Sequence, residues 1–163
     1  MDQQERRAFV RSHRTCVFGY NRGDDGPAMT VVYYVMNGDD ELLISTMAAR
    51  SKARAVGGGR KVSVCVLDEK WPLTYVVIYG TARIERDLDK AVDLMTRIYG
   101  LMAGNAMPTS TRPEIEATAR REERVVVRIT PYATFETPPR HVYKPEDAKG
   151  LTHSLGSTLP WSG

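Results

Sequence analysis

A basic window lies between Leu42 and Leu67, where the chain carries five cations and no carboxylate. The cations are Arg50, Lys52, Arg54, Arg60 and Lys61. Arginine offers phosphate and carboxylate oxygens a planar fork of N–H donors, and lysine offers a point charge. The residue types and their crowding therefore indicate an anion-binding site.

Arg50, Ser51 and Lys52 are the strongest candidates for direct contact with a phosphate. They follow the strand-like run 41–46 and lie early in a short helix-like segment, 48–56. Unpaired backbone N–H groups at such a junction add to the positive potential, and Ser51 either caps the helix or donates to the phosphate. A solvated basic helix start is the alternative, but the absence of acids favours the phosphate.

Composition limits the classes of protein to consider. The chain has 163 residues, enough for one domain with a hydrophobic core, and its 42% apolar and 26% charged residues are typical of an ordinary globular protein. A net charge of +3, and no aromatic residues interleaved in the basic window, argue against nucleic acid as the partner. No apolar run reaches membrane-spanning length, so we expect no membrane partner.

Location and metal content follow from a few residues. The N-terminus is polar and carries two acids, which is unlike a secretory signal, and Cys16 and Cys65 lie in apolar runs typical of reduced core residues. We therefore expect a cytoplasmic protein. The three histidines are far apart and neither cysteine has a neighbouring ligand, so we expect no metal site.

Periodicity and turn residues predict a mainly β, α+β chain. Strands are expected at 15–20, 29–36, 41–46, 61–67, 73–84, 124–129 and 132–136, and helices at 3–13, 48–56, 88–103 and 111–123. Most strands follow one another through turns, which implies antiparallel pairing. Several are apolar on both faces, as in a rolled sheet or a sheet covered by a second subunit.

Three local features add detail to this pattern. Asn37-Gly38 predicts a hairpin, and Gly80 inside a long strand predicts a bend or a close approach of backbone. The sequence Thr111-Arg-Pro-Glu114 has the form of a capping box. We expect one domain over 1–137, and an arm or tail over 138–163 whose last dozen residues are mobile or reach outward.

The order of these elements resembles the pyridoxamine 5'-phosphate oxidase-like family of flavin- or deazaflavin-binding split β-barrels. The likeness covers about residues 5–137 and rests on four stretches in order: 26–34, 42–46, Arg50-Ser-Lys52, and 61–67 with 75–84. The third stretch is similar to the family's phosphate motif. The resemblance implies a six- to seven-stranded antiparallel split β-barrel with about three peripheral helices.

The chain looks closer to the actinobacterial branch that uses the deazaflavin coenzyme F-420. That likeness implies a cytoplasmic homodimer with the cofactor in a groove between subunits, and hydride transfer from the reduced deazaflavin to a small conjugated substrate. Phosphate would contact Arg50, Ser51 and Lys52. The alternatives are FMN on the same fold, or a flavin- or tetrapyrrole-binding module without turnover.

Further contacts are implied for the cofactor ring and tail. The backbone at Ser45, Thr46 and Met47 either faces the ring or is a plain strand end. Tyr75, with Tyr79, either stacks on a ring or packs in the barrel. Trp71 is a candidate wall for a pocket or a dimer seam. The cations at 54, 60 and 61 either steer an acidic cofactor tail or are ordinary surface charge. No catalytic acid or base is assigned.

Overall fold

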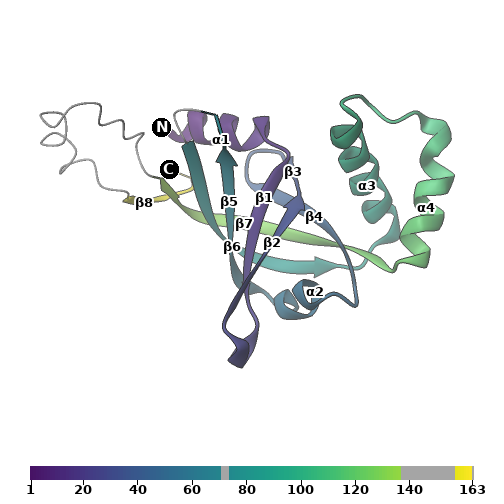
Figure 1. Cartoon of the computed structure of the whole chain (residues 1–163), viewed down its shortest axis with the longest axis horizontal. Helices are drawn as coiled ribbons and strands as arrows, with labels where there is room; N and C mark the ends of the chain where they lie inside the picture. The colour runs from purple at the N-terminus through teal and green to yellow at the C-terminus, as the bar shows by residue number, and fades with distance from the viewer. Residues whose placement is uncertain (71–73, 137–156, 163) are drawn as a thin grey trace, which may run out of the picture.

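A computed structural model describes residues 1–70, 74–136 and 157–162. Within these ranges one antiparallel sheet of eight strands curls around a hydrophobic core, in the order β2-β1-β5-β6-β7-β4-β3, with β8 paired to β7 (Figure 1). The strands are β1 (Thr15–Asn21), β2 (Pro27–Tyr33), β3 (Val35–Asn37), β4 (Glu41–Met47), β5 (Arg60–Asp68), β6 (Thr74–Glu85), β7 (Arg124–Glu136) and β8 (Ser157–Pro160). The predicted split β-barrel is confirmed.

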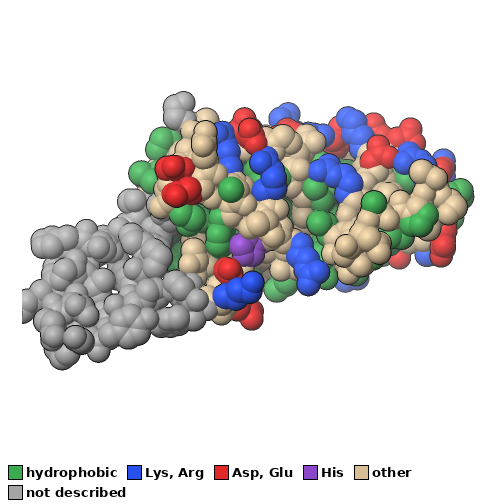
Figure 2. All heavy atoms as spheres, turned by 90° about the horizontal axis from the view of Figure 1, so that it is seen from above, with side chains coloured by type: hydrophobic (Ala, Val, Ile, Leu, Met, Phe, Trp, Pro, Cys, Tyr) green, Lys and Arg blue, Asp and Glu red, His purple; other side chains and the backbone are tan. Residues whose placement is uncertain are grey.

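Four α-helices surround this sheet in the described residues. They are α1 (Gln3–Ser12), α2 (Ser51–Val56), α3 (Leu88–Ala103) and α4 (Arg112–Arg121), with short 3-10 turns η1 (Gly23–Asp25) and η2 (Thr109–Thr111). Figure 1 shows α1 across one end of the sheet, α2 at the opposite end, and α3 and α4 as a pair at one side. Acidic and basic side chains are interspersed over that helical side, as expected of a solvated surface (Figure 2).

The core lies on the inner face of the curled sheet. Alternate residues of β1, β5 and β6 point into it, among them Phe18, Val64 and Ile78, all fully buried. On the outer face, Leu43 of β4 and Val126 of β7 pack against α3. Because α3 covers only this part, the outer face of β2, β1 and β5 is left without a helix (Figure 1).

The hairpin predicted at Asn37-Gly38 is confirmed, whereas the strand predicted before it is divided. Asn37-Gly38 does turn β3 into β4, with Gly38 at φ 62°. The strand expected over 29–36 is divided at Tyr34 into β2 and β3, although the Tyr34 N–H still donates at 3.1 Å to Arg14 O, which lies opposite it in the β1–β2 register. Tyr34 is buried and its hydroxyl donates to Val10 O, so its side chain is fixed to α1.

The second half of the chain departs from expectation at two places. The strands predicted at 124–129 and 132–136 are one continuous β7. The capping box at α4 is absent, because the Thr111 hydroxyl donates to Pro108 O at 2.6 Å and makes no cap bond. Residues 137–156 and Trp71 lie outside the described residues.

The chain end returns to the sheet, so the expectation of a mobile tail is wrong for residues 157–162. β8 pairs with β7, and Trp161 is buried in the barrel core. The Trp161 indole N–H donates to Asp40 Oδ1 at 3.1 Å, and the Arg7 guanidinium lies 5.6 Å from the ring centroid. The end of the chain therefore closes the barrel beside α1.

Gly80 sits where the β6–β7 register shifts, which confirms the predicted irregularity. A Cβ at this position would lie 2.6 Å from Ile129 Cγ2 and 3.0 Å from Thr130 O. The two strands can therefore approach closely only because residue 80 lacks a side chain.

We predict that Gly80→Ala lowers the free energy of unfolding by about 1–3 kcal/mol, because the added methyl overpacks the barrel. Gly57→Ala is the matched control: its φ is −56° and its nearest neighbour would be 3.6 Å away, so it is expected to be neutral or slightly stabilising. Urea denaturation of both variants measures the difference. Equal stability of the two would contradict the close approach.

Candidate functional site

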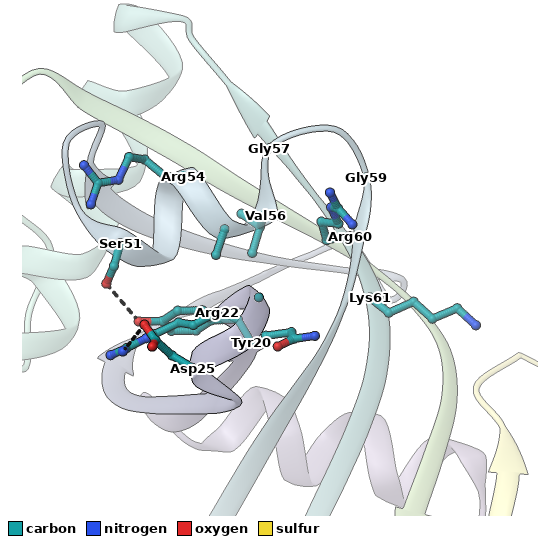
Figure 3. Close-up of a pocket in the computed structure, with 13 residues that line it drawn as sticks. Tyr20, Arg22, Asp25, Ser51, Arg54, Val56, Gly57, Gly59, Arg60 and Lys61 are labelled. Carbon is teal, nitrogen blue, oxygen red and sulfur yellow. Dashed lines mark hydrogen bonds and ion pairs between the residues drawn. The ribbon is translucent and has the colours of Figure 1, made fainter.

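A cavity of about 1000 Å³ opens between α2, the glycine loop after it, and the tip of the β1–β2 hairpin. We call it the basic cavity. Its charged and hydroxyl-bearing lining residues are Tyr20, Arg22, Asp25, Ser51, Arg54, Arg60 and Lys61. They come from two stretches of chain, the β1–β2 hairpin over 20–25 and the segment from α2 into β5 over 51–61, and Figure 3 shows the two side by side.

The charge of this cavity is not balanced by carboxylates. Asp25 is the one acid among the described residues that line it, and it is held by Arg22 at 2.7 Å. Arg54, Arg60 and Lys61 make no ion pair with any described residue; Lys61 instead lies 5.6 Å from the ring centroid of Tyr132. The cavity thus presents a net positive surface to solvent.

Tyr20 and Ser51 join the two sides of the cavity. Their hydroxyl oxygens are 3.1 Å apart, and Figure 3 shows the two side chains pointing toward one another. Tyr20 is nearly buried, with its ring stacked on Phe18 at 5.6 Å, so it is a fixed partner. Sequence reasoning did not single out Tyr20, because nothing local marks a strand residue that meets α2.

The predicted phosphate residues divide between two faces of α2. Ser51 lines the basic cavity, whereas Arg50 and Lys52 do not. Lys52 is partly buried, and its pKa is lowered first by that burial and then by the positive charges of Arg50 and Arg124. We call Arg50, Lys52 and Arg124 the Lys52 cluster.

Arg124 is the member of the cluster that the sequence did not reveal. It opens β7 opposite Met47, the last residue of β4, and pairs with Glu122 at 2.6 Å. Arg50 and Lys52 have no carboxylate partner among the described residues. A single carboxylate therefore faces three cations, which leaves the cluster with a net positive charge.

The Lys52 charge also acts on the buried thiol of Cys16. Burial, with a smaller effect from Cys65, raises the pKa of the Cys16 thiol to about 12, and the Lys52 charge opposes that rise. The pKa of Cys65 is raised by burial as well, and both cysteines are free. Neither thiol is therefore a reactive thiolate at neutral pH.

Of the residues expected to contact the cofactor ring, only some lie near the Lys52 cluster. Met47 neighbours Arg124 in the sheet, and its carbonyl accepts from Arg50 N at 3.1 Å. Thr46 is buried, and Ser45 has a buried hydroxyl with no hydrogen-bond partner. Tyr75 pairs with Leu67, whereas Lys61 pairs with Thr81 on the same strand. Tyr75 is therefore six residues, or about 20 Å, from Thr81 along β6, and it does not line the basic cavity. The roles of all four stay predictions.

In the described ranges, no three His, Cys, Asp or Glu side chains gather in a way that would hold a metal ion. No helix in that part of the chain is long and apolar enough to span a membrane.

Comparison with known proteins identifies the family. Residues 2–137 match the family model described as pyridoxamine 5'-phosphate oxidase, so the chain belongs to that family. No curated protein sequence matches the chain.

Solved structures share the fold at low sequence identity. The conserved hypothetical protein Rv2991 from Mycobacterium tuberculosis is 22% identical, with a TM-score of 0.72 over 90% of this chain and 94% of that one. A structure named F420 reductase is 18% identical, with a TM-score of 0.60 over 78% and 93%. The heme storage protein HutZ from Vibrio cholerae is 14% identical, with a TM-score of 0.57 over 78% and 88%. At such identities the likeness concerns the fold.

We predict that inorganic phosphate binds less tightly as pH rises through the lowered pKa of Lys52. The neutral amine attracts no dianion, so the loss begins at a lower pH than for an ordinary lysine. Calorimetric titration from pH 8 upward measures the effect, and Lys52→Arg is the control because its guanidinium stays charged. Identical pH profiles for the wild type and Lys52→Arg would contradict the assignment.

Proposed function

We propose that this protein is an oxidoreductase of the deazaflavin-dependent, actinobacterial branch, which uses reduced coenzyme F-420 to transfer a hydride to a small conjugated substrate. The observation that carries the proposal is the Lys52 cluster. A partly buried ammonium repelled by two guanidinium groups is a costly arrangement that a bound dianion relieves. Family membership supports a redox cofactor as the source of that dianion.

The residues present fit a phosphate-bearing cofactor. Arg50 and Lys52 would hold the phosphate, with Arg124 as a third cation from the neighbouring strand. Ser51, fixed by Tyr20, would orient the chain that leads away from it. The cofactor supplies the hydride chemistry when bound, and the chain supplies binding, orientation and exclusion of water.

The basic cavity favours the deazaflavin over FMN. Its unpaired cations Arg54, Arg60 and Lys61 suit the oligoglutamate tail of F-420, whereas FMN has no such tail. FMN on the same phosphate site is the second candidate, since the Lys52 cluster itself does not distinguish between the two phosphates. A module that binds a flavin or tetrapyrrole without turnover is the third.

A homodimer belongs to the same proposal. Along the outer face of the sheet, apolar residues from neighbouring strands form one row: Val31, Val17, Cys65, Val77 and Phe135. Met29 and Val31 are each 73% exposed. Antiparallel sheets normally carry polar residues on a solvated face, so an apolar row of this kind favours a covering partner, and a second copy fits the cofactor groove between subunits.

We predict that wild-type protein binds F-420 and that Lys52→Glu weakens it by at least tenfold, because the change replaces an attraction to phosphate with a repulsion. The double variant Arg60→Glu/Lys61→Glu is expected to weaken F-420 and leave FMN unaffected. Fluorescence titration of both cofactors measures this.

The outcomes separate the three candidates. Equal binding of both cofactors to wild type and Lys52→Glu rules out the phosphate site. Binding of FMN alone, unchanged by the double variant, assigns the FMN alternative. Tight binding of either cofactor, with no reduction of any enone, quinone or bilin acceptor, assigns a binding module.

We predict that the protein sediments as a dimer and that Val31→Asp converts it to a monomer, because a charge is placed in the apolar row. Met102→Asp is the control, since Met102 is 51% exposed at the end of α3, away from the sheet face. Analytical ultracentrifugation measures the mass. A monomeric wild type, or a Val31→Asp variant that stays dimeric, would overturn the interface.

A further inference from the structure

A second cavity, of about 550 Å³, lies between β3 and the last turn of α3. Its lining includes Val35, Arg97, Leu101, Ala106 and Met107. It shares no lining residue with the basic cavity. Its volume falls within the range of roughly 300–1,000 Å³ that small-molecule sites occupy.

Glycine at the end of α3 makes this cavity. Gly104 takes the left-handed conformation at φ 74° and ends the helix. The loop then folds back so closely that a Cβ at Gly100 would lie 3.0 Å from Asn105 O. The loop therefore carries Ala106 and Met107 over the last helical turn, where they face Leu101 and Val35 across the cavity.

The walls are apolar, but the cavity has a positive edge. No charged group comes from the apolar lining residues Val35, Leu101, Ala106 and Met107. The Thr96 hydroxyl already donates a hydrogen bond to Val92 O at 2.8 Å. Arg97 is the one charged side chain among the described residues of the lining.

Arg97 is available to a ligand. One of its N–H groups donates to Met36 O at 2.8 Å, and it forms no ion pair with any described residue. Asp93, one turn earlier on α3, is held by Arg112 at 2.6 Å. A second guanidinium, that of Arg14, donates to Leu101 O at 3.4 Å and adds positive charge at the same edge. Each guanidinium keeps N–H donors beyond the one used.

We propose that this cavity binds an apolar molecule that carries one carboxylate, with its hydrocarbon part against Leu101 and Met107 and its carboxylate on Arg97. Apolar walls with one fixed charged group are the usual design of a small-molecule site, and a guanidinium pairs with a carboxylate through two parallel hydrogen bonds. The site is separate from the proposed cofactor site and goes beyond the proposed function.

The test follows decanoate by NMR of methyl-labelled methionine. The Met107 methyl signal is expected to shift and saturate, while that of Met29 on the outer sheet face stays in place. Decyltrimethylammonium, with the same chain and the opposite charge, is expected to bind at least tenfold more weakly. Failure of decanoate to shift Met107 at millimolar concentration, or equal binding of the two amphiphiles, overturns the proposal.

Two variants locate the site, and one serves as control. Arg97→Gln keeps a donor for Met36 O and removes the charge, so decanoate affinity is expected to fall at least tenfold. Ala106→Trp fills the cavity and should abolish binding. Arg83→Gln is the control, because Arg83 is exposed on β6 and lines no part of this cavity.

Folding and the cofactor site are checked in the same samples. The remaining methionine signals and the melting temperature report whether each variant folds, and F-420 titration is expected to be unchanged in Ala106→Trp. Decanoate binding that survives in both Arg97→Gln and Ala106→Trp overturns the proposal. If the wild type does not bind F-420, the proposal for this cavity is unaffected, because the two tests use different residues.

Discussion

Around α2 the positive charges have too few carboxylates to balance them, and the proposed anion binding depends on that imbalance. Several arginines elsewhere are paired, as Arg7 is with Asp40 at 2.6 Å and Arg128 with Glu85 at 2.9 Å. Around α2 the Lys52 cluster has one carboxylate for three cations, and the basic cavity adds more unpaired cations. Like charges held close together raise the free energy of the folded state, and a bound anion lowers it.

The barrel is what keeps those charges together. α2 is only six residues long and would not be a stable helix by itself. Val56 and Ala53 bury its inner side against the sheet, and the Tyr20–Ser51 contact fixes its start to β1. The tight β6–β7 approach at Gly80 and the burial of Trp161 stabilise the sheet on which this arrangement rests. A rigid scaffold of this kind holds binding groups in place without a ligand.

Local signals predicted most elements, and the errors have physical causes. Hydrophobic alternation and turn residues placed the strands to within a few residues, because those signals act over a few positions along the chain. The capping box failed because Thr111 found a competing acceptor in Pro108 O. The strand expected over 29–36 divides at Tyr34, whose buried side chain donates its hydroxyl to Val10 O of α1. The last residues joined the sheet because Trp161 is buried in the core, a gain that their polar neighbours did not reveal.

The sequence by itself determined the family, the antiparallel barrel and the acid-free window that supplies the charge, since each is a matter of residue type and order. Only the tertiary structure decided how that charge is shared. It placed Ser51 and Lys52 on different faces of α2, brought Arg124 to Lys52 through the β4–β7 register, and set Tyr20 against Ser51. Electrostatic and hydrogen-bond contacts act over a few ångströms of space, and it is strand pairing between distant segments that decides which side chains come within that range.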